Sequence, residues 1–141
     1  AKKCKMENIF NTIISGKRKT AVAKLRIKLG DGKVFYNNLP YNELNLFHKL
    51  ALLEPIKIYE RELGELKYNL FIKTSGGGKE AQIQAARLAI ANALVKATSS
   101  DILKKAYIAY DRNMLVADSR RKEAAKPGDS AARAKRQKSY R

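Results

Sequence analysis

The sequence predicts an α+β domain of two layers, with a basic arm before it and an extended basic tail after it. Segments in which every second residue is apolar alternate along the chain with segments of helical apolar spacing. The chain has 141 residues and 45% hydrophobic content, which suits one core. Residues 119 to 141 carry no periodic apolar pattern, so we expect the core to end before them.

We expect the chain to comprise an arm (1 to 14), a globular domain (15 to 118) and a tail (119 to 141), with the net charge concentrated in residues 1 to 28 and 119 to 141. Residues 1 to 28 hold 9 basic and 1 acidic residue, a net charge of +8. The tail holds 9 basic and 2 acidic residues, a net charge of +7, whereas residues 29 to 118 hold 12 and 10. Most of the total net charge of +17 therefore lies in two terminal segments. This pattern is typical of a protein whose globular domain docks on a polyanion and whose basic terminal segments extend along it.

The first element that the sequence predicts is a β-hairpin. Leu25, Ile27 and Leu29 alternate with basic residues, which indicates a strand with one buried face. Val34 and Tyr36 follow the turn sequence "GDG" and are expected to form the second strand of the hairpin.

A helix follows in "LPYNELNLFHKLALLEPIKIYE". Pro55 is expected to end it, because the residue before a proline avoids the helical conformation. Ile56 and Ile58 would then start an extended segment. The expected apolar face of this helix comprises Leu44, Phe47, Leu50, Ala51 and Leu53.

The second half of the domain is predicted as a strand and two helices. In "ELKYNLFIKTS" the residues Leu66, Tyr68, Leu70 and Ile72 alternate with mostly polar ones, which predicts a strand. "SSDILKKA" has a serine cap and an acidic first turn, typical of a short helix that ends near its lysines. Between them, "KEAQIQAARLAIANALVKA" is an alanine-rich helix whose buried face comprises Ile83, Ala86, Ile90, Ala93, Leu94 and Ala97.

Candidate catalytic and metal sites are weak. "SGGGKEAQ" could hold a phosphate at a helix N-terminus, but it lacks the P-loop and dinucleotide spacings, so a tight turn is favoured. His48 and Cys4 have no ligand set or nucleophile nearby in sequence. The carboxylates of Glu60, Glu62 and Glu65 fit a solvated face. We therefore expect no enzyme activity, cofactor or metal.

The leading partner class is nucleic acid. The tail lacks the apolar face of an interfacial helix, so a membrane is the weaker alternative, and no stretch reaches the roughly 20 apolar residues of a spanning helix. No signal-peptide core is evident, and an intracellular protein is expected. Two rival functions stay open at this point: a free nucleic-acid chaperone with basic ends, and a phosphotransferase using the glycine turn.

Four segments carry a family resemblance. They are "GKRKTAVAKLRI", "GGGKEAQIQAARLAIANAL", "DSRRKEAAKPG" and the closing "QKSYR". Their order and spacing resemble those of the family of the ninth protein of the small ribosomal subunit, over roughly residues 15 to 141. The closing "KSYR" leaves a bacterial, archaeal, eukaryotic or organellar source open, although the short middle region resembles bacterial or organellar members.

The resemblance implies a four-stranded mixed sheet with a left-handed βαβ crossover, in a structural protein of a cytoplasmic or organellar ribosome. The implied partners are the 3′ (head) domain of small-subunit rRNA, the anticodon stem-loop of peptidyl-site tRNA and neighbouring head proteins, with no membrane. The implied tRNA contacts are Lys138, Ser139, Tyr140 and Arg141. The implied rRNA contacts are Lys17, Arg18, Lys19, Arg112, Arg120, Arg121, Lys122, Lys126, Arg133, Lys135 and Arg136.

Three positions depart from the family's pattern. Ser119 follows Asp118 where the family commonly has proline, so we expect a less rigid exit from the domain. Asp129 adds an acid to the tail, and Arg136 stands where an aromatic residue often precedes the glutamine.

Overall fold

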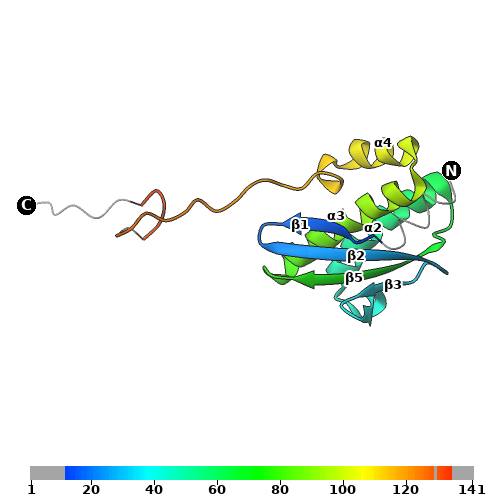
Figure 1. The fold of residues 1–141 in the computed structure, drawn as a ribbon, viewed down its shortest axis with the longest axis horizontal. Coiled ribbons are helices and arrows are strands. Elements are labelled where there is room, and N and C mark those ends of the chain that lie inside the picture. The colour runs from blue at the N-terminus through cyan, green and yellow to red at the C-terminus, as the bar shows by residue number, and fades with distance from the viewer. Residues whose placement is uncertain (1–11, 129, 135–141) are drawn as a thin grey trace, which may run out of the picture.

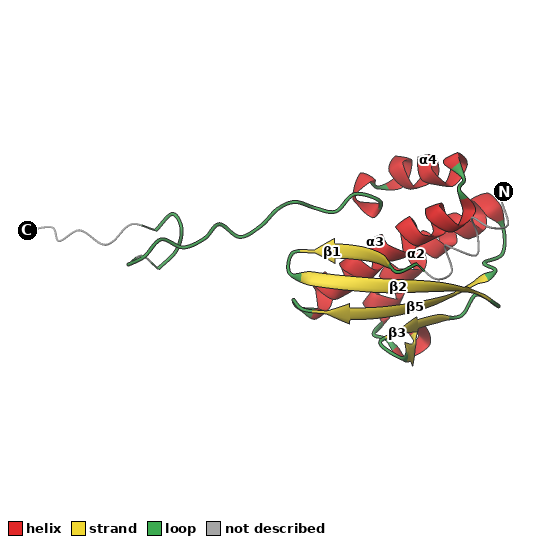
Figure 2. Ribbon diagram, viewed as in Figure 1, coloured by secondary structure: helices red, strands yellow, loops and turns green. Residues whose placement is uncertain are grey.

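The computed structural model describes residues 12 to 128 and 130 to 134. In this part of the chain, helices cover one face of a β-sheet, and the tail leaves the domain as an extended segment (Figure 1). Helix α3 packs on the sheet, α2 packs beside α3, and α4 packs on α2 (Figure 2). The predicted two-layer α+β architecture is confirmed. The helices are α2 (Leu46–Leu63), α3 (Lys79–Thr98) and α4 (Asp101–Tyr110), with 3-10 turns η1 (Tyr41–Glu43) and η2 (Arg112–Met114).

The described residues form one mixed sheet in the order β1-β2-β5-β3-β4. It has five strands rather than the expected four, because β4 adds a short pair at one edge. All pairings are antiparallel except that of β3 with β5, which α2 connects as a βαβ unit. The left-handed sense of this connection stays a prediction. The strands are β1 (Ile14–Arg18), β2 (Ala21–Leu29), β3 (Val34–Tyr36), β4 (Leu39–Pro40) and β5 (Tyr68–Ser75).

The predicted hairpin between the segments that form β2 and β3 is wrong. Strand β5 lies between β2 and β3 and pairs with both. The "GDG" turn carries the chain across the end of β5, where Gly30 N donates to Lys67 O at 3.1 Å and Leu70 N donates to Lys33 O at 2.8 Å. The true partner of β2 in a hairpin is β1, joined through a turn in which Lys19 has a φ of 51°. Alternation identifies strands, but it carries no information about which strands pair.

The expected helix end at Pro55 is also wrong. Helix α2 continues through Pro55 to Leu63, and no extended segment begins at Ile56. The buried residues of α2 are Leu52, Pro55, Ile56 and Tyr59, a helical stripe that extends across the proline. Their burial offsets the roughly 3 kcal/mol that an interior proline costs a helix. Of the face expected from the sequence, Phe47 and Leu50 are exposed, with 76% and 47% of their surface accessible, whereas Leu44, Ala51 and Leu53 are partly buried.

A buried hydrogen bond supports α2 at the proline. Tyr107 of α4 donates its hydroxyl proton to Pro55 O at 2.7 Å. Burial raises the pKa of Tyr107 far above its ordinary value, so the hydroxyl stays protonated and remains a donor. The second half of α2 is thereby fixed against α4.

The alanine-rich helix forms as predicted. All six residues of its expected face are buried in α3, and small side chains let the helix lie close to β1 and β2. Helix α4 has the expected cap, in which Ser100 Oγ accepts from Leu103 N at 3.5 Å. It continues beyond the expected end at its lysines to Tyr110. The predicted alternation is confirmed in β2 and β5, where Leu25, Ile27, Leu70 and Ile72 are buried, whereas Leu29 is exposed.

Candidate nucleic-acid interface

Asp118 joins the two basic segments that the sequence places 100 residues apart. Arg18, the last residue of β1, donates through Nη1 to Asp118 Oδ2. Arg120, the second residue of the tail, donates to the same oxygen through Nη2 at 2.6 Å and Nε at 2.9 Å. One carboxylate therefore ties the start of the tail to the edge strand of the sheet.

The local geometry of Asp118 also fixes the direction in which the tail leaves. Asp118 Oδ1 accepts a hydrogen bond from the backbone N of Arg120 at 2.8 Å, the contact that defines an Asx-turn. The side-chain and backbone hydrogen bonds from Arg120, together with that from Arg18, hold the pKa of Asp118 far below its ordinary value. This turn restrains the exit at Ser119, where the sequence led us to expect a less rigid chain.

We call the contacts of Asp118 with Arg18 and Arg120 the Asp118 joint. A small cleft of about 130 Å³ lies beside this joint, lined by residues that include Lys17, Arg18, Asn113 and Arg120. The Lys17 side chain is exposed, whereas Arg18 is partly buried by its ion pair. Two backbone segments thus present cations around one concave surface, whose lining also includes the carboxylates of Asp111 and Asp118. Such convergence suits a phosphate backbone, which cations bind in a salt-dependent way.

Arg87 lies in the same cleft but is already neutralised. Its Nε lies 2.6 Å from Glu54 Oε2 as an ion pair without hydrogen-bond geometry, and its Nη1 lies 3.3 Å from Asp111 Oδ2. These contacts link α3 to α2 and to the end of α4. Arg87 therefore has a structural role within the domain.

The other predicted RNA contacts fall into four groups. Lys19 and Arg112 are exposed in the β1–β2 turn and in η2. Arg133 Nε donates to Glu123 Oε2 at 2.8 Å, so the tail bends back on itself. Within the described residues, Arg121, Lys122 and Lys126 are exposed and have no acidic partner. Six predicted contacts lie outside the described residues: Lys135, Arg136, Lys138, Ser139, Tyr140 and Arg141.

The glycine segment before α3 makes a tight turn. Gly76 and Gly77 have φ values of 73° and 63°, which favour glycine, and a Cβ at Gly76 would lie 2.7 Å from Thr20 O. These constraints account for Gly76 and Gly77 without a ligand. His48 is paired, with its Nε2 2.7 Å from Glu80 Oε1, a contact that sequence reasoning missed. Among residues 12 to 128 and 130 to 134, no cluster suits a metal ion and no helix could cross a membrane.

The Asp118 joint predicts a pH-dependent stability. Because its pKa is depressed in the folded state, Asp118 contributes stability above the ordinary carboxyl pKa of about 4, and that contribution is lost as the pH falls below it. Asp118→Asn should therefore lower Tm at neutral pH. The difference in Tm between this variant and the unsubstituted protein should narrow as the pH of the thermal denaturation falls from about 5 to 3. A gap of constant size would contradict a stabilising charge on Asp118.

Comparisons with known proteins identify the family of this chain. The model of the family "Ribosomal protein S9/S16" matches residues 16 to 141. The chain is 40% identical over 129 residues to the small ribosomal subunit protein uS9 of Methanococcus maripaludis, covering 89% of this chain and 95% of that protein. It is 38% identical over 128 residues to uS9 of Methanothrix thermoacetophila, covering 90% and 96%. Both relatives are archaeal, whereas the sequence led us to expect bacterial or organellar similarity. By these matches, the chain belongs to the ribosomal protein S9/S16 family.

Proposed function

We propose that this protein is a structural constituent of the small ribosomal subunit that binds rRNA through the joined basic segments around Asp118. The observation that carries the proposal is the convergence of Lys17 and Arg18 with Arg120 on one cleft, from which the tail extends. Cations on a rigid edge position an RNA backbone, and an exposed tail without a core can order on RNA. Membership of a ribosomal protein family agrees with the expectation that the protein is not an enzyme.

The finer part of the proposal concerns which RNAs are bound. The domain and the first part of the tail contact the 3′ (head) domain of small-subunit rRNA, next to neighbouring head proteins. The tip of the tail, Lys138 to Arg141, reaches the anticodon stem-loop of peptidyl-site tRNA. The protein works in a ribosome of the cytoplasm or of an organelle. The length of chain beyond Asp118 supports this division, because 23 residues follow it and extended residues span about 3.3 Å each.

Deleting residues 138 to 141 tests the division of labour. The shortened protein should enter small subunits nearly as well as the full chain, because the domain and the proximal tail hold the rRNA. Retention of tRNA in the peptidyl site should weaken, measured by filter binding on purified subunits. Equal loss of subunit incorporation and tRNA retention would contradict the proposal. The matched control replaces Lys79, an exposed lysine at the start of α3, by glutamine.

A further inference from the structure

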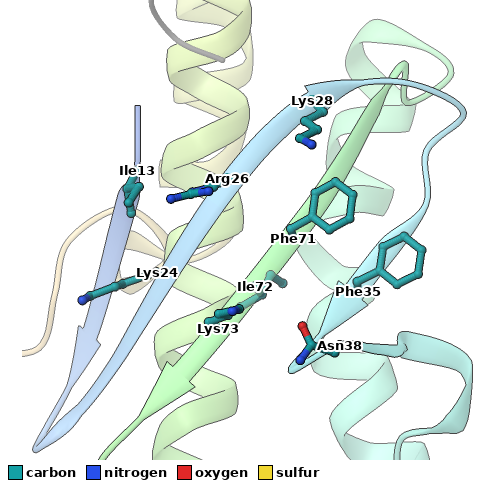
Figure 3. Close-up of a pocket in the computed structure, with 9 residues that line it drawn as sticks. All are labelled: Ile13, Lys24, Arg26, Lys28, Phe35, Asn38, Phe71, Ile72 and Lys73. Atoms are coloured by element: carbon teal, nitrogen blue, oxygen red, sulfur yellow. The ribbon is translucent and has the colours of Figure 1, made fainter. Parts of the chain in front are cut away.

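The face of the sheet opposite the helices carries a basic surface that sequence reasoning did not assign (Figure 3). In β2, Ala23, Leu25 and Ile27 are buried, so the residues between them point to the other face. Those residues include Lys24, Arg26 and Lys28, all exposed. The register of β2 with β5 sets Lys24 opposite Lys73 and Arg26 opposite Phe71. We call the surface formed by Lys24, Arg26, Lys28, Phe35, Phe71 and Lys73 the open face.

Two phenylalanines stack on each other in the middle of the open face. The rings of Phe35 and Phe71 are parallel within 4°, with centroids 5.2 Å apart. Lys28 Nζ lies 5.5 Å from the centroid of Phe71, in cation–π range. A hollow of about 610 Å³ lies over this group, in the size range of small-ligand sites. An outward-facing pair of aromatic rings is unusual, because a sheet face that is open to solvent normally carries polar side chains.

The charges of the open face are unbalanced. None of the five strands contains an aspartate or glutamate. Lys24 and Lys73 lie directly opposite each other, an arrangement that destabilises a sheet through like-charge repulsion. Among the described residues, Lys24, Arg26, Lys28 and Lys73 form no ion pair. A polyanion would offset this repulsion.

We propose that the open face binds a single-stranded segment of RNA, with unpaired bases stacking on the Phe35–Phe71 pair and phosphates on the surrounding cations. Single strands combine a phosphate backbone with exposed base faces, and both chemistries are present on this surface. An RNA duplex hides its base faces, and an acidic protein offers none to stack. Asn38, exposed at the edge of the same hollow, can donate to and accept from a base edge. The inference rests on the proposed function only in naming RNA as the partner.

A tryptophan reporter tests the stacking directly, because the chain contains no tryptophan. The full-length Phe71→Trp variant is titrated with oligouridine of about ten nucleotides, and with an RNA duplex of the same length. Stacked bases should quench the indole emission with the single strand and much less with the duplex. The matched control is Phe47→Trp, which lies on α2 on the helical side and is 76% exposed. Its emission should change little with either RNA.

Affinity measurements provide a second readout that a folding defect would not mimic. Phe71→Leu should weaken binding of fluorescein-labelled oligouridine about tenfold with an unchanged salt slope, because stacking is not electrostatic. Phe71→Trp should restore the affinity, and Phe47→Leu should leave it unchanged. Lys73→Gln should instead reduce the salt slope by about 0.7.

Two results would overturn the inference while leaving the proposed function intact. One is unchanged oligouridine affinity in Phe71→Leu in a protein that still enters small subunits. The other is that the emission of Phe71→Trp does not change with RNA but shifts when residues 1 to 11 are removed. That result would identify the arm as the occupant of the open face. Failure of the unsubstituted protein to enter small subunits would instead contradict the proposed function.

Discussion

Gly16→Ala is expected to lower the free energy of unfolding by about 3 kcal/mol, among the largest effects of any one-carbon change in this chain. Gly16 is buried in β1 against α3. A Cβ there would lie 2.1 Å from Ala85 O and 2.8 Å from Ala89 N. Both atoms are backbone, so no side chain can move aside and α3 itself must shift. The backbone of Gly16 lies outside the left-handed region, so the cost comes from the contact alone.

The measurement is urea denaturation at equilibrium. The matched control is Ser15→Ala, the neighbouring exposed position of β1, which should change the free energy by less than about 0.5 kcal/mol. A small effect of Gly16→Ala would mean that α3 lies farther from the sheet than the structure shows. Because β1 ends at Arg18, Gly16→Ala should also disturb the contact between Arg18 and Asp118.

Replacing Arg120, Arg121 and Lys122 by glutamine is expected to weaken rRNA binding about a hundredfold near 0.15 M salt. Each phosphate contact contributes about 0.7 to 0.9 to the slope of log affinity against log salt, so the slope should fall by roughly 2 to 3. Arg121 and Lys122 are exposed, and the Arg120 side chain is 80% exposed despite its pairing with Asp118. The measurement is a salt titration of binding to the 3′ domain of small-subunit rRNA.

The control for this prediction removes the same net charge elsewhere. Lys57 and Arg61 are exposed in the second half of α2, and Lys96 is exposed near the end of α3. Their triple replacement by glutamine should reduce affinity only through the general field of the protein, with the salt slope nearly unchanged. If both triple variants lose affinity equally, net charge rather than the tail start governs binding.

Local patterns were sufficient to predict the elements whose evidence lies within one segment. The face of α3 follows from small and aliphatic residues at helical spacing, and the alternation in β2 and β5 follows from burial of one sheet face. Non-local features were not predictable in this way. The insertion of β5 between β2 and β3 and the continuation of α2 through Pro55 depend on packing between distant segments. Tertiary burial there overrides the local preference of a proline or a turn.

The candidate site likewise has some features that the sequence predicts and others that depend on the fold. Charge density identifies the segments around Lys17 and Arg120 as basic, but only the fold brings them together through Asp118. Sequence reasoning named Asp118 only as the residue before the departure at Ser119, with no role of its own. The stacked Phe35 and Phe71 come from strands that are neighbours only because the chain crosses over through α2. The proposed contacts at the tip of the tail stay predictions from the sequence.

Ultraviolet crosslinking in native cell extract tests the central claim most directly, with sequencing of the attached RNA and mass spectrometry of the attached peptides. We predict crosslinks from residues 17 to 19 and 120 to 133 to the 3′ domain of small-subunit rRNA. The peptide with residues 138 to 141 should carry tRNA anticodon stems. Crosslinks scattered over unrelated RNAs, without enrichment in small subunits, would contradict the claim and favour a free nucleic-acid chaperone.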